Sequence, residues 1–161
     1  MRNIIEKMDQ HYIVCGFGRM GEKVCESLEK RNISFVVIDQ QRTKIDICNE
    51  RGWPNICGDV TDDDVLHKAK VSNASGMAIA LDEDSSNVFV CLSARILNPE
   101  IQIIARASSE AGSKKMRRAG ADKVVNIHDT GANKMAELMT NTKLSDFVEL
   151  FKDANSELDL A

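Results

Sequence analysis

The feature that most constrains the fold of this chain is the stretch 16–21, Gly-Phe-Gly-Arg-Met-Gly, which directly follows the apolar run 12–15. An apolar strand, a G-x-G-x-x-G turn and a helix in this order are typical of a dinucleotide-binding βαβ unit. Gly16 permits a tight turn, Gly18 lets the backbone approach a pyrophosphate, and Gly21 lets the helix pack close to its strand. The first amides of that helix lack partners at the positive end of its dipole, so an anion fits there.

Glycine-rich turns also occur for packing alone, so the motif needs context. A second apolar run, 35–38, supplies it because this run ends in Asp39, eighteen positions after Gly21. An acidic side chain at this strand end can hydrogen-bond the hydroxyls of an adenosine ribose. A carboxylate there would also repel a 2′-phosphate, which favours NAD over NADP. We therefore expect a dinucleotide or an adenine nucleotide at the turn; the alternative is the same fold with a vestigial site.

Strand and helix patterns alternate along the chain at a spacing of roughly 20–25 residues, which is the βαβ rhythm. Strands are predicted at 12–15, 35–39, 55–57, 77–81, 101–105 and 123–127. Helices are predicted at about 19–31, 41–51, 86–97 and 131–142, with a short acidic helix after residue 61 and a polar helix reaching about residue 118. The pattern predicts an α/β fold: a Rossmann-like, doubly wound, mainly parallel six-stranded sheet with helices on both faces.

The length of 161 residues suffices for one domain with a single core. We expect a linker at 1–10, the Rossmann-like domain at 11–142 and a C-terminal extension at 143–161. The extension contains Phe147 and Phe151, which are too apolar to face water. We expect them to pack on a partner subunit or on a domain outside this chain; packing back on the same domain is the alternative.

Composition excludes several classes of function. A net charge of −4, with no basic stripe carrying interleaved aromatic residues, argues against nucleic-acid binding. The five cysteines are odd in number and form no C-x-x-C pair, and Cys15, Cys25 and Cys91 fall on predicted core faces. We interpret them as small buried hydrophobic residues. No signal peptide and no apolar run of membrane-spanning length occurs, so a cytoplasmic location is expected.

Catalytic chemistry has little support in the sequence. The βα units use up the chain, which leaves no domain to hold a substrate beside a nicotinamide. The histidines, His11, His67 and His128, lie in different segments without the spacing of a metal site or of a base paired with a nucleophile. His128, expected at the end of the sixth strand, is the best acid–base candidate, although a plain surface histidine is the simpler interpretation. We predict no catalytic and no metal-binding residue.

Three charged residues are expected just past strand ends, where ligands lie in open α/β sheets: Asp59, Asp82 and Arg106. Arg106 could pair with a phosphate, or it could form a surface ion pair. Asp59 could accept a hydrogen bond from a ribose or an adenine, or it could be a turn or capping residue. The acidic run 82–84 invites a calcium site, but a solvated loop before a helix is the preferred interpretation.

Five segments together resemble the N-terminal lobe of an RCK domain, the regulator of potassium conductance, also known as the TrkA-N domain. They are 11–21 (HYIVCGFGRMG), 37–39 (VID), 58–61 (GDVT), 103–107 (IIARA) and 119–125 (AGADKVV). The resemblance runs from about residue 11 to 151. It implies a cytoplasmic sensor without enzymatic activity that binds NAD(H) or, as a second choice, ADP, ATP or AMP. The alternative function is a small stand-alone NAD-dependent oxidoreductase.

The resemblance also implies the site and the partners. The nucleotide-binding residues would be Gly16, Phe17, Gly18, Arg19, Met20, Gly21, Asp39, Gln40, Asp59, Val60, Asp82 and Arg106. Such lobes form homodimers, tetramers or octameric rings and gate the membrane subunit of a potassium channel or transporter, which implies a location at the inner face of the membrane. Calcium-activated relatives carry acids where this chain has Arg106 and Ser108, so no calcium site is expected. The family's smaller C-terminal lobe is missing, which implies a fragment or a minimal version.

Overall fold

The computed structural model describes residues 2–141 and 152. The chain divides into two compact units, Met1–Asn126 and Ile127–Ala161, and each is described by itself. The predicted segment with Phe147 and Phe151 lies outside the described residues. The predicted division of the chain at residues 10 and 142 stays a prediction.

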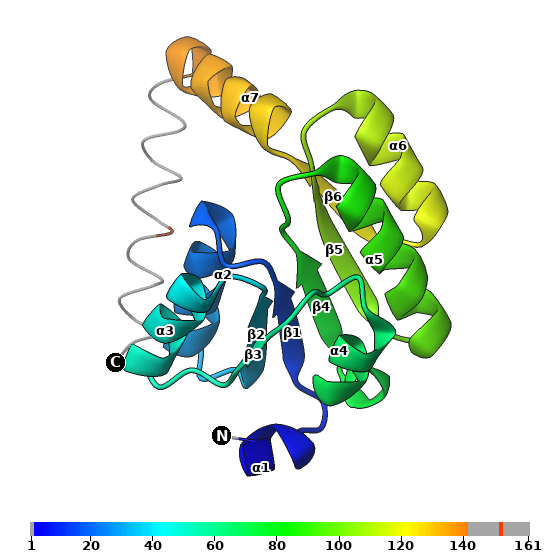
Figure 1. Ribbon diagram of the computed structural model, residues 1–161. Coiled ribbons are helices and arrows are strands. Elements are labelled where there is room, and N and C mark those ends of the chain that lie inside the picture. Colours follow the sequence, from blue (N-terminus) through cyan, green and yellow to red (C-terminus); the bar gives the residue numbers. More distant parts are fainter. Residues whose placement is uncertain (1, 142–151, 153–161) are drawn as a thin grey trace. The chain divides into compact units, whose positions relative to one another are not determined.

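The first unit is built around one sheet of six parallel strands (Figure 1). In chain order they are β1 (Tyr12–Cys15), β2 (Phe35–Asp39), β3 (Asn55–Cys57), β4 (Gly76–Ile79), β5 (Gln102–Ala107) and β6 (Lys123–Asn126). Their order in the sheet is β3-β2-β1-β4-β5-β6, so the winding direction reverses between β1 and β4. The predicted doubly wound α/β fold is confirmed, and ligands of such sheets lie beyond the strand ends at that reversal.

Helices cover both faces of this sheet (Figure 1). They are α1 (Arg2–Glu6), α2 (Arg19–Lys30), α3 (Arg42–Glu50), α4 (Asp63–Lys68), α5 (Asp84–Leu97) and α6 (Glu110–Ala119), with a 3₁₀ turn η1 (Val71–Asn73) after α4. Two separate clusters of buried side chains show the sides: α2 and α3 pack on one face, and α4, α5 and α6 on the other. Strand side chains alternate between them, so that Val14 and Val37 face α2 while Ile13 and Ile38 face the opposite layer.

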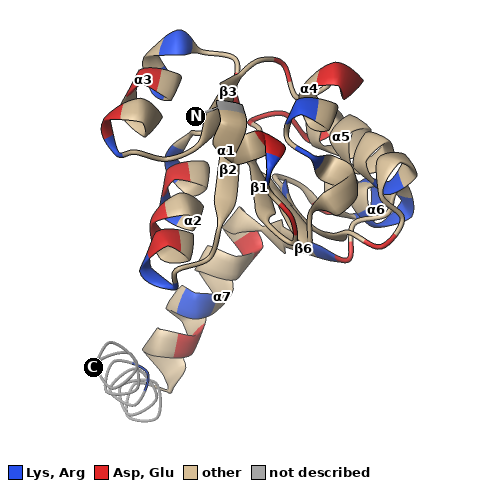
Figure 2. Ribbon diagram, turned by 90° about the horizontal axis from the view of Figure 1, so that it is seen from below, with Lys and Arg blue, Asp and Glu red and all other residues tan. Residues whose placement is uncertain are grey.

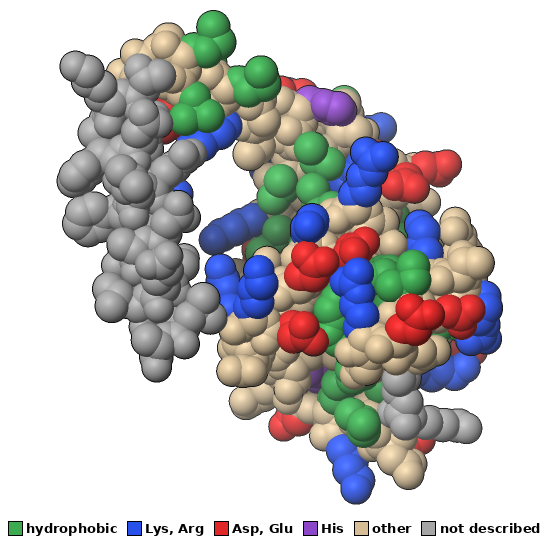
Figure 3. Space-filling model, turned by 90° about the vertical axis from the view of Figure 1, so that its left-hand side faces the viewer, with side chains coloured by type: hydrophobic (Ala, Val, Ile, Leu, Met, Phe, Trp, Pro, Cys, Tyr) green, Lys and Arg blue, Asp and Glu red, His purple; other side chains and the backbone are tan. Residues whose placement is uncertain are grey.

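The layer under α2 and α3 holds the aromatic part of the core. Trp53 packs edge-on against Phe17 and Phe35, with ring centroids 6.0 and 5.7 Å apart. The guanidinium of Arg51 lies over the same indole at 4.8 Å and donates to Glu22 on α2 at 2.7 Å. These contacts join the end of α3 to α2. Acidic and basic side chains are interspersed along α2 (Figure 2). The face of the molecule drawn in Figure 3 shows the same mixture of charges.

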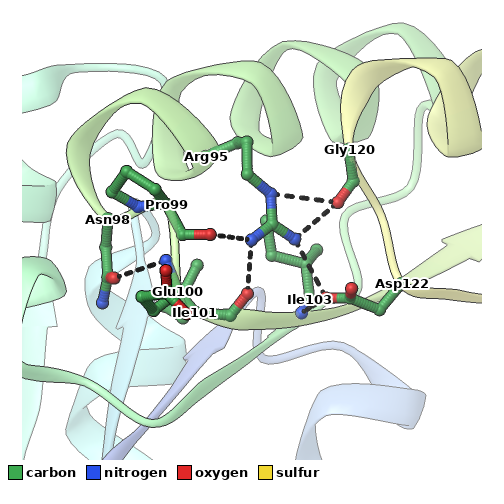
Figure 4. A network of polar contacts seen from close by, with 8 residues as sticks. All are labelled: Arg95, Asn98, Pro99, Glu100, Ile101, Ile103, Gly120 and Asp122. Atoms are coloured by element: carbon green, nitrogen blue, oxygen red, sulfur yellow. Dashed lines mark hydrogen bonds and ion pairs between the residues drawn. The ribbon is translucent and has the colours of Figure 1, made fainter.

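Arg95, in the last turn of α5, ties together the amino ends of β5 and β6 (Figure 4). Its guanidinium donates to the carbonyl oxygens of Pro99 (2.8 Å), Ile101 (2.7 Å) and Gly120 (2.6 Å) and to the carboxylate of Asp122 (2.9 Å). The backbone N–H of Ile103 donates to the same carboxylate at 2.7 Å. The pKa of Asp122 is held below its usual range, mainly by the hydrogen bond from Ile103 and next by Arg95.

The second unit begins with α7 (Ile127–Thr140), directly after the last residue of β6. The helix was predicted to start at residue 131, so the expected loop is absent from this junction. The predicted strand 123–127 accordingly ends one residue early, and His128 lies exposed in the first turn of α7. No residue of α7 is buried, and Met135 and Met139 are 67% and 81% exposed.

Candidate functional site

The turn after β1 requires its first glycine for two reasons. Gly16 has φ +96°, a conformation that L side chains rarely adopt, and a Cβ there would lie 2.8 Å from the carbonyl oxygen of Ala80. The N–H of Gly16 donates to the carbonyl oxygen of Ile38 at 2.9 Å. The turn therefore lies tightly between the end of β2 and Ala80, the residue after β4.

The other two glycines have different roles. Gly18 is the N-cap residue of α2, and apart from Gly18 itself and the residues next to it in the chain, no atom lies within 4 Å of the position that its Cβ would take. A Cβ at Gly21 would overlap the carbonyl oxygen of Gly16, so Gly21 lets the helix begin tightly against the turn. Gly18 directly precedes the first amides of α2, which lack intrahelical acceptors and can bind an anion.

Asp39, at the end of β2, is held by backbone groups of two loops. Its Oδ2 accepts from the N–H of Phe17 at 2.9 Å, and its Oδ1 accepts from the N–H of Gln41 at 2.8 Å. The carboxylate therefore joins the glycine turn to the loop after β2. A carboxylate offers about four lone pairs, so both oxygens can still accept from ribose hydroxyls. The amide of Phe17, in contrast, is already used and its ring is buried.

A cavity of about 430 Å³ opens at the carboxyl ends of β1, β2, β3 and β4. Seven of the twelve expected binding residues line it: Gly16, Gly18, Asp39, Gln40, Asp59, Val60 and Asp82. Phe17, Arg19, Met20, Gly21 and Arg106 are not among its lining residues. Sequence reasoning missed the lining residues Ile38, Gln41, Lys44, Gly58, Thr61, Ala80, Leu81, Glu83 and Ser86. Ala80 and Leu81 were expected inside the fourth strand, which ends at Ile79 instead.

Asp59 forms the side of the cavity after β3. Its Oδ1 accepts from the backbone N–H of Thr61 at 2.9 Å and from the Thr61 hydroxyl at 2.7 Å. The hydroxyl bond first, and then the backbone bond, lower the pKa of Asp59 from its ordinary value. The residue is thus a turn residue, as the alternative proposed. Its Oδ2 accepts no hydrogen bond from the described part of the chain, so it is available to a ligand as well.

The opposite wall comes from the loop after β4. Asp82 is 88% exposed at the side chain, and Arg106 approaches it with Nη1 at 3.7 Å from Oδ1. Arg106 was expected just past the fifth strand but lies inside β5, paired with Val125. Its observed partner is Asp82, and this contact is the surface ion pair that the sequence offered as the alternative to phosphate binding.

The charges around the cavity determine which part of it can hold the phosphates of a ligand and which part can hold its hydroxyl and amino groups. Four carboxylates line it, from Asp39, Asp59, Asp82 and Glu83, and the cation among the lining side chains is Lys44. Carboxylates accept hydrogen bonds from hydroxyl and amino groups but repel phosphates. Phosphates are therefore best accommodated by the α2 amides beside Gly18, and ribose and base by the carboxylates.

The histidines do not gather at the cavity. His11 is fully buried, and its Nε2 lies 2.8 Å from the carbonyl oxygen of Ala69. His67 is on α4 and His128 is on α7. Of the five cysteines, Cys57 is exposed and the other four are buried, which confirms the prediction for Cys15, Cys25 and Cys91. Among the described residues, no helix combines the length and apolar character needed to cross a bilayer.

Comparison with known proteins places this geometry in context. The model of the TrkA-N domain family matches residues 12–127. The chain is 35% identical over 162 aligned residues to Potassium channel protein 1 of Methanocaldococcus jannaschii, an alignment that covers 99% of the chain. It covers 49% of that protein, so the chain spans about half the length of this relative.

Solved structures show the same fold. The TrkA-N domain of the inner membrane protein ybaL from Escherichia coli superposes with a TM-score of 0.80 at 30% identity, covering 82% of this chain and 98% of that one. The GsuK channel bound to NAD gives a TM-score of 0.68 at 27% identity, over 74% and 22% of the two chains. GsuK bound to ADP gives 0.72 at 31% identity, over 88% and 37%.

Proposed function

This chain belongs to the TrkA-N domain family, and we propose that it is a nucleotide-binding regulatory domain that gates a potassium channel or potassium transporter. The observation that carries the proposal is the contact between Asp39 and the glycine turn. The carboxylate holds the loops after β1 and β2 together while keeping lone pairs for a ribose. Beside it, Gly18 leaves room for phosphates at the first amides of α2.

The proposed ligand is NAD(H), with AMP, ADP and ATP as the next candidates. The cavity extends from Asp39 and Asp59 on one side to Asp82 on the other, which suits a molecule with two nucleoside ends and phosphates between them. Its four lining carboxylates disfavour ligands with many phosphates, so we expect ATP to bind more weakly than NAD. GsuK, a relative with known structures bound to NAD and to ADP, supports this ligand class.

In this proposal the chain binds its ligand and does not convert it. The nucleotide bridges the loops after β1, β2, β3 and β4 and so favours one arrangement of the assembled domains over another. A ligand shifts such an equilibrium only by its difference in affinity for the two states. The relatives named above include channels and an inner membrane protein, which supports regulation over the alternative of a stand-alone oxidoreductase.

The partners follow from the same proposal. The chain acts on a membrane subunit that forms a potassium pathway, from the cytoplasmic face of the membrane. It assembles with copies of itself as a dimer, a tetramer or an octameric ring. The exposed methionines of α7, Met135 and Met139, are apolar surface of the kind that such assembly covers.

Isothermal titration of the purified chain with NAD⁺, NADH, AMP, ADP and ATP tests the proposal, with light scattering on each mixture to follow assembly. Asp39→Arg removes the ribose acceptor and places a cation against the turn, so NAD affinity should fall about 100-fold or more. Asp46→Arg on α3 makes the same charge change away from the cavity and serves as the control.

The outcomes separate cleanly once both variants show helix content and melting close to wild type. Loss of NAD binding in the Asp39 variant alone supports the ribose assignment, whereas equal affinity in all three proteins removes it. Wild-type protein that binds none of the five nucleotides refutes the proposed function.

A further inference from the structure

We propose that Asn87 is the positioning residue of the distal half of the nucleotide cavity, the side lined by Leu81 and Asp82 after β4. Asn87 lies in the first turns of α5, is fully buried, and does not itself line the cavity. Its side chain fixes the backbone that carries Asp82 and Arg106. The inference rests on the proposed function, because the role it assigns is to shape a site for a nucleotide with two halves.

The hydrogen bonds of Asn87 connect the loop after β4 to the end of the strand β5. Its Oδ1 accepts from the N–H of Leu81 at 3.0 Å, and its Nδ2 donates to the carbonyl oxygen of Leu81 at 3.0 Å. The same Nδ2 donates to the carbonyl oxygen of Arg106 at 3.1 Å. Both donor hydrogens and one acceptor position are therefore used, inside the protein and away from water.

These bonds begin where the sheet stops. The last pair between β4 and β5 joins Ile79 to Ala105. Beyond it, the asparagine side chain joins Leu81 to Arg106 in place of a β4–β5 ladder, while Arg106 remains paired with Val125 of β6. Because Leu81 lines the cavity and precedes Asp82, the position of the distal wall depends on this amide.

A neighbouring residue of α5 reinforces the same connection. The Asp84 carboxylate accepts from the N–H of Ser108 at 3.0 Å, and a Cβ on Gly112 of α6 would overlap it. The first turns of α5 thus hold the end of β5 through Asn87 and the loop after β5 through Asp84. Asp84 contacts that loop from a half-buried position, whereas Asn87 is the fully buried member that also holds Leu81.

The proximal half of the cavity is built without Asn87. Asp39 is fixed by Phe17 and Gln41, and Asp59 is fixed by Thr61. A mononucleotide such as AMP needs this half and the glycine turn. NAD needs both halves. The inference therefore predicts that a change at Asn87 weakens NAD binding and spares AMP binding.

The test measures NAD and AMP affinities by calorimetry on three variants of the whole chain. Asn87→Asp keeps the shape and one acceptor but turns both donors toward Leu81 and Arg106 into acceptors. Asn87→Ala removes all three bonds. We expect NAD affinity to fall about tenfold in both, with AMP affinity changed by less than about twofold, because buried polar groups lose their partners on one side of the cavity only. Asn87→Ser keeps one hydroxyl donor, so its NAD affinity should lie between that of the wild type and those of the other two variants.

The same helix offers a matched control at its other end. Asn98 is also buried; its Nδ2 donates to the carbonyl oxygens of Val71 at 2.9 Å and Ala74 at 3.1 Å, and its Oδ1 accepts from the N–H of Glu100. Asn98→Ala breaks the same number of bonds far from the strand ends that form the cavity. It should lower the melting temperature as much as Asn87→Ala and leave the ratio of NAD to AMP affinity unchanged.

The outcomes distinguish the inference from the proposed function. Wild-type protein that binds neither NAD nor AMP overturns the inference, and the proposed function is refuted as well if ADP and ATP also fail to bind. Wild-type protein that binds both, with the same affinity ratio in the Asn87 and Asn98 variants, overturns the inference alone, because Asn87 then serves stability only. A lowered ratio at Asn87, partly restored in Asn87→Ser, supports the positioning role.

Discussion

Replacing Arg95 by methionine should destabilise the fold by about 3 kcal/mol. The change removes the donor to the carbonyl oxygens of Ile101 and Gly120, each bonded at 2.7 Å or less, and Ile101 is buried. A buried acceptor left without its partner costs about 1–1.5 kcal/mol at the low end of measured values. The bonds to Pro99 and Asp122 are more exposed, and water replaces much of their contribution, so they add about 0.5 kcal/mol together.

Thermal unfolding followed by circular dichroism measures this effect. A loss of about 3 kcal/mol corresponds to a fall of about 6–12 °C in melting temperature for a chain of this length. Arg118→Met, on the exposed side of α6, makes the same chemical change at a side chain without a hydrogen bond in residues 2–141, and should shift melting by under about 2 °C. Equal melting of the two variants would refute the reasoning, because it would mean that water satisfies these carbonyls as well as the guanidinium does.

Two further predictions concern the glycine turn and the thiols. Gly16→Ala should destabilise the fold by about 3 kcal/mol, because it combines a left-handed φ of +96° with a 2.8 Å contact to the backbone. Gly18→Ala should keep its free energy of unfolding within about 1 kcal/mol of wild type but bind NAD at least about tenfold more weakly. Reversal of these two effects in melting and calorimetry would contradict the assigned roles. Burial raises the pKa of Cys25 to about 12 and that of Cys48 to about 11. At pH 8 an aromatic disulfide reagent should therefore react with Cys57 alone in the folded protein and with all five thiols in guanidinium. A second fast-reacting thiol in the folded protein would show that the core opens.

The sheet could be predicted from the sequence because buried parallel strands appear as short aliphatic runs separated by helix patterns. Local boundaries followed less well. The run 77–81 is apolar throughout, yet only its first three residues belong to β4, because Ala80 and Leu81 turn away to form the cavity wall. Apolar side chains pack equally well on a strand and on a cavity wall, so hydrophobicity alone does not mark that strand end.

The site was predictable where one residue type has one role. Gly16 and Asp39 combine a motif with a strand end, and both line the cavity. Asn87 could not be found in this way, since an asparagine in a helical pattern gives no sign that three backbone groups, from the loop after β4 and from β5, converge on it. The ion pair of Arg106 with Asp82 likewise depends on two strands being neighbours in space. Such roles are properties of the assembled sheet.

The single tryptophan is a fluorescence reporter for one layer of the fold. Trp53 touches Phe17, the residue after Gly16, and its indole N–H donates to Glu29 on α2. Emission from Trp53 should therefore respond to a ligand that moves the glycine turn or to loosening of α2 and α3. The opposite layer, under α5 and α6, contains no aromatic residue in its buried cluster. Partial unfolding confined to that layer would leave the emission nearly unchanged, so fluorescence and circular dichroism transitions that fail to coincide would reveal which half of the fold opens first.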